Sequence, residues 1–235
     1  MHKANIDNLT GLWRLMRADR LSSGLWQSEC WPRRCWGGWE DGLNSTGQAL
    51  LREAPVGYLC PIWDVGVETA DVENDLLAGG FEMGLQQRAM VLPLHEVEPI
   101  ESTLTLNLSA IGSEQDAAIW AEVCGRAFGY HIDVGVIDRL RNLPEVEVLW
   151  ATREGAVVAT AILYHSGAVT GVHQVGVPPE LQGQGIAREL MWQLVARLKT
   201  TAVESLCLQA SAAGEPLYLN MGFKPQFLMR SYRRI

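Results

Sequence analysis

The chain has 235 residues, of which 48% are hydrophobic and 20% are charged. This composition supports a packed core and leaves room for one large domain or two small ones. The formal net charge of −8 argues against general binding to nucleic acids or anionic membranes, because such proteins carry a basic face. No stretch of about 18 apolar residues and no signal-peptide pattern occurs, so we expect a cytoplasmic protein without a membrane or nucleic-acid partner.

The five cysteines form neither a disulfide framework nor a zinc-binding pattern. Their number is odd, and the one close pair, Cys30 and Cys35, has no second pair of ligands at zinc spacing. We therefore expect ordinary reduced thiols and no bound metal.

Tryptophan is concentrated in the first forty residues, which begin with an amphipathic stretch over residues 1–20. Large aromatic side chains dominate the burial energy of small domains, so filling a core is the favoured interpretation. Lining a ligand cleft is the alternative. The tryptophans of this group are Trp13, Trp26, Trp31, Trp36 and Trp39.

Two segments of the chain resemble each other. Residues 75–81 and 217–223 both predict a short helix, a glycine at its C-terminal end and a phenylalanine that opens a strand. Glycine suits the left-handed conformation that ends such a helix. We interpret the chain as two related halves that meet in the polar segment 94–102, with one domain at 1–100 and a second at 101–235.

The second half alternates strands and helices and therefore predicts an α/β (α+β) fold. Ser113 is expected to be the N-cap of a helix that reaches Phe128, with acidic residues in the first turn. Residues 146–150 and 157–163 predict a hairpin that turns at residues 153–155. The remaining elements are strands over 104–108, 169–177 and 205–209, an amphipathic helix over 185–199, and a helix from about Pro216 followed by a last strand.

The sharpest motif runs from Val177 to Ala187, where a strand leads into a glycine-rich turn and then into a helix. Gly183 and Gly185 remove side chains where a backbone must approach a ligand closely. The helix start adds unpaired N–H groups and the positive end of the helix dipole, so the turn suits a pyrophosphate. Arg188 stands where a dinucleotide-binding G-x-G-x-x-G motif needs its third glycine, and no Gly-Lys-Ser/Thr sequence for ATP occurs.

This segment resembles motif A of the GNAT superfamily of N-acetyltransferases in the form V-x-P-x-x-(R/Q)-G-x-G-(I/L)-(G/A). A second family marker, Tyr-x-x-x-Gly-Phe, is matched downstream by Tyr218, Gly222 and Phe223. The resemblance extends from about residue 104 to residue 235. It implies a mixed central sheet flanked by helices, with acetyl-CoA as the cosubstrate. Together with the repeat, it implies a truncated, degenerate GNAT-like domain followed by a complete one.

The resemblance also assigns the coenzyme contacts. Backbone N–H groups of the turn would hold the pyrophosphate. Main-chain groups of Val175 and Val177 would pair with the pantetheine arm, where the strands that carry Val177 and Leu208 diverge. Many relatives have an asparagine six residues before the tyrosine, where this chain has Ala212, so Ser211 is the expected substitute contact. The residues of the turn are Gln182, Gly183, Gln184, Gly185, Ile186, Ala187 and Arg188.

The resemblance makes Tyr218 the general acid that protonates the departing thiolate, since a phenol with a pKa near 10 matches a thiol in basicity. A tyrosine that only packs is the alternative. His173 is the candidate general base, because its pKa suits neutral pH and its spacing from Val177 predicts the same strand face as Val175 and Val177. A core histidine is the alternative there. The weaker candidates for the base are Glu215 and His165.

The loop of residues 128–133 occupies the place where the resemblance puts one wall of the acceptor cleft. Phe128 and Tyr130, with the single acid Asp133, would suit an amine that carries an apolar group, and would equally suit plain packing. We therefore expect transfer of acetyl to a primary amine of a small molecule or peptide, by a monomer or a homodimer. The alternatives are a non-catalytic acyl-CoA-binding regulatory module and a protein N-terminal acetyltransferase. The tryptophan-rich half is expected to complete the fold or shape the cleft without binding coenzyme.

Overall fold

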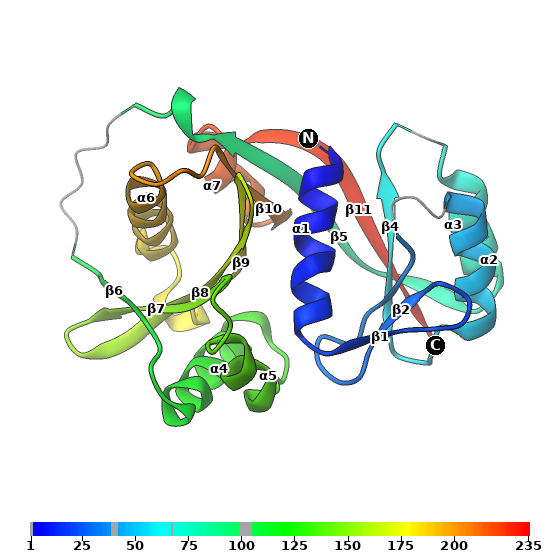
Figure 1. The fold of residues 1–235 in the computed structure, drawn as a ribbon, viewed down its shortest axis with the longest axis horizontal. Helices are drawn as coiled ribbons and strands as arrows, with labels where there is room; N and C mark the ends of the chain where they lie inside the picture. Colours follow the sequence, from blue (N-terminus) through cyan, green and yellow to red (C-terminus); the bar gives the residue numbers. More distant parts are fainter. Residues whose placement is uncertain (1, 39–41, 67, 99–104) are drawn as a thin grey trace. The chain divides into compact units, whose positions relative to one another are not determined.

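The computed structural model describes residues 2–38, 42–66, 68–98 and 105–235 (Figure 1). The chain divides into two compact units. The first unit comprises Met1–Val91 together with Gln209–Ile235, and the second unit comprises Leu92–Leu208. None of the described helices is long and apolar enough to cross a membrane.

This division differs from the expected domain boundary. The last strand of the chain, β11 (Lys224–Arg234), pairs antiparallel with β4 (Leu59–Asp64) and with β5 (Phe81–Pro93). Backbone pairing over these lengths ties the C-terminal residues to the first unit, so the expected domain at 101–235 is not one compact unit. Residues 99–102 of the expected boundary lie outside the described ranges.

The first unit also contains a small antiparallel sheet with the strand order β1-β2-β3. The amphipathic start of the chain forms its first helix. The helices and remaining strands of this unit are α1 (His2–Leu15), β1 (Ala18–Arg20), β2 (Trp26–Ser28), β3 (Cys35–Trp36), α2 (Leu43–Glu53), α3 (Ala70–Ala78) and α7 (Glu215–Asn220).

The two resembling segments have the same local structure. Helix α3 is followed by Gly80, with φ +84°, and by Phe81 at the start of β5. Helix α7 is followed by Gly222, with φ +89°, and by Phe223 just before β11. A left-handed glycine thus follows both helices, as predicted, and the two strands pair with each other. The local repeat is confirmed, while the relation of the two halves as domains stays a prediction.

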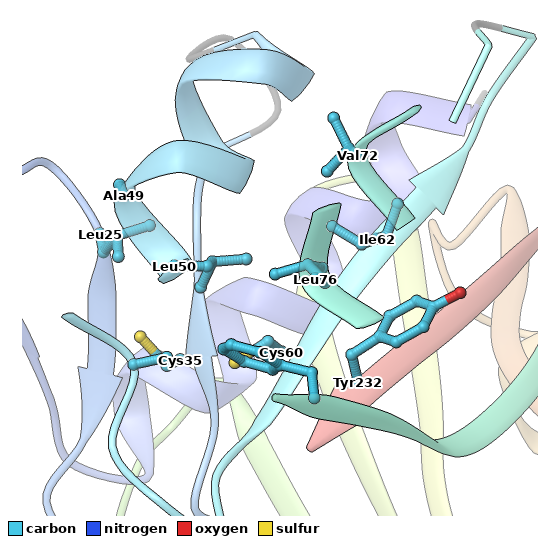
Figure 2. Packing of buried hydrophobic residues seen from close by; sticks show 11 residues of the cluster. Leu25, Cys35, Ala49, Leu50, Cys60, Ile62, Val72, Leu76 and Tyr232 are labelled. Carbon is cyan, nitrogen blue, oxygen red and sulfur yellow. The ribbon is translucent and has the colours of Figure 1, made fainter. Parts of the chain in front are cut away.

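Apolar side chains from helices and strands form a buried cluster in the first unit. Leu50 of α2 and Leu76 of α3 point toward each other beside Ile62 of β4 (Figure 2). Cys35 and Cys60 lie in the same cluster, and their contact and their burial raise the pKa of the Cys60 thiol. All five cysteines are free thiols, as the sequence predicts.

The tryptophans of the first unit are used mainly for packing. Trp13 and Trp36 are 5% and 1% exposed, and their rings meet edge to face at 5.2 Å. Both therefore fill a core, which agrees with the favoured interpretation. Trp26 and Trp31 are half-buried, and Trp39 lies outside the described ranges.

The second unit is a mixed sheet with helices, as expected for an α/β fold. Its strands follow the order β10-β9-β8-β7-β6, with β9 and β10 parallel and the other neighbours antiparallel. The elements are η1 (Leu94–Glu96), β6 (Asn107–Ala110), α4 (Glu114–Phe128), α5 (Val134–Leu140), β7 (Val146–Arg153), β8 (Ala156–Ser166), β9 (Val169–Gly176), η2 (Pro179–Leu181), α6 (Ile186–Leu198) and β10 (Ser205–Ser211), whose last three residues belong to the first unit.

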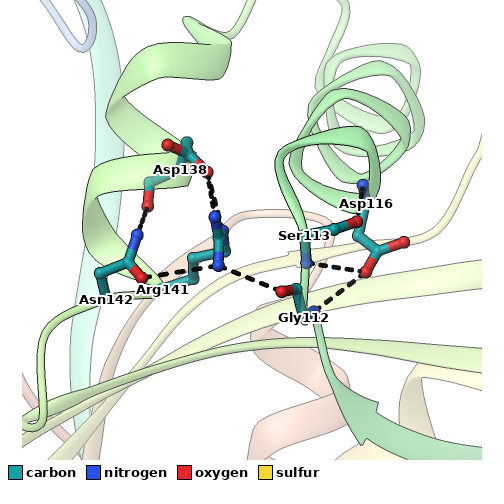
Figure 3. A network of polar contacts seen from close by, with 6 residues as sticks. All are labelled: Gly112, Ser113, Asp116, Asp138, Arg141 and Asn142. Atoms are coloured by element: carbon teal, nitrogen blue, oxygen red, sulfur yellow. Dashed lines mark hydrogen bonds and ion pairs between the residues drawn. The ribbon is translucent and has the colours of Figure 1, made fainter.

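The start of α4 has the cap that the sequence predicts. The Ser113 hydroxyl accepts a 3.1 Å hydrogen bond from the Asp116 N–H, and the Asp116 carboxylate accepts from the N–H groups of Gly112 and Ser113 (Figure 3). This reciprocal arrangement satisfies N–H groups that a helix start leaves unpaired. Arg141, just after α5, donates to the carbonyl of Gly112 and pairs with Asp138, so the end of α5 is tied to the start of α4.

Helix α5 was not predicted. It begins because the Asp133 carboxylate accepts hydrogen bonds from the N–H groups of Gly135, at 2.8 Å, and Val136, at 3.3 Å. Asp133 was expected to be the acid of the acceptor wall. Its carboxylate is used as a helix cap instead, so the wall keeps its aromatic residues without a free acid at this position.

Candidate functional site

The glycine turn lies on the surface of the second unit, between β9 and α6. Gly183 and Gly185 have φ values of +76° and +80°, a region that residues with a Cβ atom rarely adopt. A Cβ atom at either position would meet no atom within 4 Å. The chain itself therefore needs glycine here for its backbone conformation, and the space beside both glycines is open.

The first turn of α6 has no side-chain cap. Gly185 is its N-cap residue and has no side chain to offer, while Ile186 is buried and anchors the helix start. Glu189, the acid of the first turn, turns its carboxylate to the N–H groups of Thr105 and Leu106. Because the first N–H groups of a helix have no intrahelical partner, the start of α6 offers donors and a positive dipole end to an anion.

Side-chain hydrogen bonds hold the turn at Gln182 and at Gln184. The Gln182 amide donates to the carbonyl of Val177 at 3.0 Å, and Arg153 donates to the Gln184 side-chain carbonyl at 2.8 Å. Residues 182–185 are exposed, Ala187 is half-buried and Arg188 is exposed. The turn is therefore held in place by its glutamines while its backbone stays accessible.

Strands β9 and β10 stop pairing before either strand ends. The parallel ladder joins Val169 to Ser205 and Gly171 to Cys207, whereas β9 continues to Gly176. The early end of this ladder is compatible with the expected divergence of the two strands. Val175, Val177 and Leu208 follow the last of these pairs.

A bulge in β9 changes the expected face of His173. His173 pairs with Ile162 of β8 and Gly176 pairs with Thr160, so three steps along β9 match two along β8. Residues two apart on β8 share a face, and so His173 and Gly176 share one. His173 therefore does not lie on the face of Val175 and Val177 that its spacing predicts. The His173 side chain is buried, with 8% of its surface exposed.

The side chains of the weaker base candidates both have polar partners. The His165 ring contacts the Thr170 hydroxyl at 2.9 Å and the Glu147 carboxylate at 3.0 Å. The hydrogen bond from His165, together with Arg197, holds the pKa of Glu147 below its usual range. Glu215 forms an ion pair with Arg88 at 3.4 Å.

Phe128 and Tyr130, which were expected to form the acceptor wall, lie together as a stacked aromatic pair. The rings of Phe128 and Tyr130 stack at 5.7 Å with an interplanar angle of 19°, and each residue is 43% exposed. A Cβ atom on Gly176 would lie 3.1 Å from Phe128 Cε2. The Tyr130 hydroxyl donates to the side-chain carbonyl of Gln174 at 3.0 Å. The structure thus brings the pair together with the end of β9.

Gln174 was not singled out from the sequence. Gln174 lies in the bulge, where β9 has one more residue than β8, and its φ is +51°. The available signal was an amide side chain within a largely apolar strand, next to His173. Strand alternation alone assumes one residue per step and cannot reveal a bulge.

Tyr218 and Ser211 belong to the first unit, whereas the glycine turn belongs to the second. Burial raises the pKa of the Tyr218 phenol to about 12. The Tyr218 ring meets Phe223 edge to face at 5.5 Å. The Ser211 hydroxyl accepts a 3.2 Å hydrogen bond from the N–H of Gly214 and keeps its own proton for a further contact. Over the residues that the structure describes, no group of three or more His, Cys, Asp or Glu could hold a metal ion.

Comparison with known proteins gives a consistent picture. Residues 144–225 match the family model described as an acetyltransferase (GNAT) domain. The mycothiol acetyltransferase of Actinosynnema mirum is 28% identical over 145 residues, which cover 55% of this chain and 48% of that protein. The chain thus spans about half the length of this curated relative.

Solved structures share the fold over nearly the whole chain. A GCN5-related N-acetyltransferase from Kribbella flavida superposes with a TM-score of 0.69 at 13% identity, covering 99% of this chain and 95% of that one. A putative GNAT-family acetyltransferase from Novosphingobium aromaticivorans superposes with a TM-score of 0.66 at 12% identity, covering 100% of both chains. At these identities the likeness concerns the fold.

Proposed function

Because residues 144–225 match the family model of an acetyltransferase (GNAT) domain, we propose that the chain transfers the acetyl group of acetyl-CoA to a primary amine of a small molecule or peptide. The observation that carries this proposal is the exposed turn of Gly183 and Gly185 at the uncapped start of α6. Open space beside the glycines and unpaired helix N–H groups fit a pyrophosphate.

The coenzyme contacts follow from the turn and the strand before it. Backbone N–H groups from Gln182 to Arg188 hold the pyrophosphate, and main-chain groups of Val175 and Val177 pair with the pantetheine arm. The early end of the β9–β10 ladder supports this role, since it leaves strand edge available there. Ser211 takes the place of the asparagine that is absent at Ala212, and its free hydroxyl proton supports that contact.

The reaction needs a neutral amine, a polarised thioester carbonyl and a proton for the leaving thiolate. The amine nitrogen attacks the carbonyl carbon, the C–S bond breaks, and Tyr218 donates its proton to the departing sulfur. The Tyr218 phenol is protonated at neutral pH and so has a proton to donate, while burial, which raises its pKa to about 12, makes it a weaker acid than a free phenol. His173 accepts the proton of the amine directly or through water. Its position on the face of Gly176, against which Phe128 packs, supports this part of the proposal.

The N-terminal half of the chain, residues 1–100, is proposed to be a degenerate relative of the C-terminal half and to bind no coenzyme. Its support is the repeated helix, left-handed glycine and phenylalanine at α3 and α7. The segment before α3 has no glycine-rich turn of the kind found before α6.

The test is a panel of small amines and short peptides incubated with the protein and acetyl-CoA. Free thiol release and the mass of the acetylated product are both measured. Gly185→Val is compared with Gly167→Val, a substitution at another left-handed glycine whose Cβ position is also open. We expect both to be strained, and only Gly185→Val to lose acetyl-CoA binding in calorimetric titration.

Two results would favour the alternatives. Binding of acetyl-CoA without acetylation of any amine would indicate a regulatory module. Acetylation of peptide N-termini alone, with no small amine accepted, would indicate a protein N-terminal acetyltransferase.

A further inference from the structure

Gln174 holds a backbone conformation that its residue type rarely adopts. Its φ of +51° lies in the left-handed region, within strand β9. The residue belongs to the bulge between the pairs His173–Ile162 and Gly176–Thr160. Such strain persists only where surrounding contacts fix it, and bulges beside functional sites re-aim side chains.

Three hydrogen bonds, from helix α4, the loop after it and strand β8, fix Gln174. The Tyr130 hydroxyl donates to its side-chain Oε1 at 3.0 Å, and the Cys124 thiol of α4 donates to the same oxygen at 3.5 Å. The Thr160 hydroxyl of β8 donates to its backbone carbonyl at 3.1 Å. Burial raises the pKa of Cys124 to about 12, so its thiol stays protonated and able to donate.

These contacts set the orientation of the Gln174 amide. Both side-chain partners are O–H or S–H donors, so they meet the carbonyl oxygen of the amide. The two protons on Nε2 are left outside these contacts. Gln174 is half-buried, and a polar donor in such a place gains most when it meets an acceptor.

The surroundings of this donor have a definite chemical character. Tyr130, which holds the amide oxygen, stacks on Phe128. Phe128 in turn lies against Gly176 at the end of the same strand. A hydrogen-bond donor on β9, the strand that enters the glycine turn, therefore lies beside an exposed aromatic pair of the same unit.

We propose that Gln174 determines acceptor specificity by donating an Nε2 hydrogen bond to an oxygen that the acceptor carries next to its amine. The apolar part of the acceptor lies on the Phe128–Tyr130 pair. The preferred class is thus a primary amine with a neighbouring carbonyl oxygen and an apolar side group, such as an amino amide. This inference rests on the proposed acetyl transfer.

The test compares pairs of acceptors that differ by the carboxamide. Suitable pairs are phenylalaninamide with 2-phenylethylamine, and leucinamide with 3-methylbutylamine. The variant is Gln174→Glu, which keeps an oxygen for Tyr130 and Cys124 but replaces the two N–H donors by an acceptor. The control is Gln115→Glu, the same chemical change at an exposed position in the first turn of α4.

The measured quantity is the ratio of kcat/KM for the two members of a pair. Both members of a pair are measured with the same protein and the same acetyl-CoA, so changes in the amount of folded protein or in acetyl-CoA binding cancel in the ratio. We expect the wild type to prefer the amide, the preference to fall about tenfold in Gln174→Glu, and Gln115→Glu to keep the wild-type ratio.

Two outcomes would overturn the inference, and they are distinguishable. An unchanged ratio in Gln174→Glu, with both members still acetylated, would remove Gln174 from acceptor recognition and leave the acetyl transfer standing. Absence of acetylation of any amine by the wild-type protein would overturn the acetyl transfer, and the role of Gln174 with it.

Discussion

The ring of Phe128 lies so close to Gly176 that a Cβ atom on the glycine would come within 3.1 Å of Phe128 Cε2. The same atom would lie 2.9 Å from the Thr160 hydroxyl and 3.0 Å from Ala127. The end of α4 therefore packs on the backbone of β9 just before the glycine turn. This contact connects the aromatic pair to the strand that carries the proposed coenzyme contacts.

We expect Gly176→Ala to destabilise the protein by about 1–3 kcal/mol, because an added methyl in a packed place forces neighbours to move. It also shifts Phe128, so KM for amines should rise. Denaturant unfolding and steady-state kinetics measure the two effects. Gly112→Ala is the control, since its Cβ would meet only Asp116 Oδ2, at an ordinary 3.8 Å. A Gly176→Ala variant as stable as the wild type would show that Phe128 and its neighbours can move without a loss in the free energy of unfolding.

The hydrogen bond between Tyr130 and Gln174 gives a second prediction. Tyr130→Phe keeps the ring stack but removes the hydroxyl that holds the Gln174 amide. We expect a loss of about 1 kcal/mol in the free energy of unfolding. The preference for carboxamide-bearing amines should weaken, while acetyl-CoA affinity stays the same. A change in acetyl-CoA affinity of the same size would contradict a role confined to the acceptor.

The glycine turn and its helix could be predicted because they follow local rules. The left-handed glycines, the apolar face of α6 and the cap at Ser113 each depend on residues within a few positions of one another. The hairpin turn also follows this rule, with Glu154 and Gly155 both left-handed.

The features that escaped prediction depend on residues far apart in the chain. The chain divides into two units in an unexpected way because β11 pairs with β5, so that the C-terminal residues belong to the first unit. The bulge that turns His173 away from the face of Val175 is defined by the register against β8. Strand alternation carries no information about that register, so a count along one strand gave the wrong face.

The capping box of α4 gives a third prediction, on stability. Ser113→Ala removes the hydroxyl that accepts from the Asp116 N–H and should cost about 1 kcal/mol in the free energy of unfolding. The control is Ser22→Ala, at an exposed serine outside this cap. A loss no larger than that of the control would show that Asp116 alone holds the helix start.

Because of the same cap, the stability of the protein should depend on pH in the acid range. The N–H of Gly112 and then the Ser113 hydroxyl and N–H lower the pKa of Asp116. A carboxylate with a lowered pKa in the folded state stabilises the protein above its ordinary pKa, and this contribution is lost as pH falls through the folded-state value. Asp116→Asn should therefore be less stable than the wild type at neutral pH, with the difference shrinking in acid. A difference that is constant with pH would contradict this account.

Tyr218 gives the last prediction, on both catalysis and alkaline stability. Because Tyr218 is the proposed acid, the substitution Tyr218→Phe should lower kcat by about 10²-fold or more, with little change in KM for acetyl-CoA. Its pKa of about 12 also lies above the ordinary value near 10, because burial disfavours the phenolate. The neutral phenol therefore contributes stability fully below pH 10, and this contribution, roughly 3 kcal/mol, is lost as pH rises to about 12.

Tyr232 of β11 provides the matched control for Tyr218. It is 3% exposed, and burial, followed by its hydrogen bond with Glu73, also raises its pKa to about 12. Each Tyr→Phe variant should lose part of the alkaline destabilisation seen in the wild type, as measured by unfolding between pH 9 and pH 12. Only Tyr218→Phe should lower kcat, because Tyr232 has no proposed catalytic role. Full activity in Tyr218→Phe would show that the leaving thiolate takes its proton elsewhere, whereas equal losses in both variants would indicate a shared structural effect.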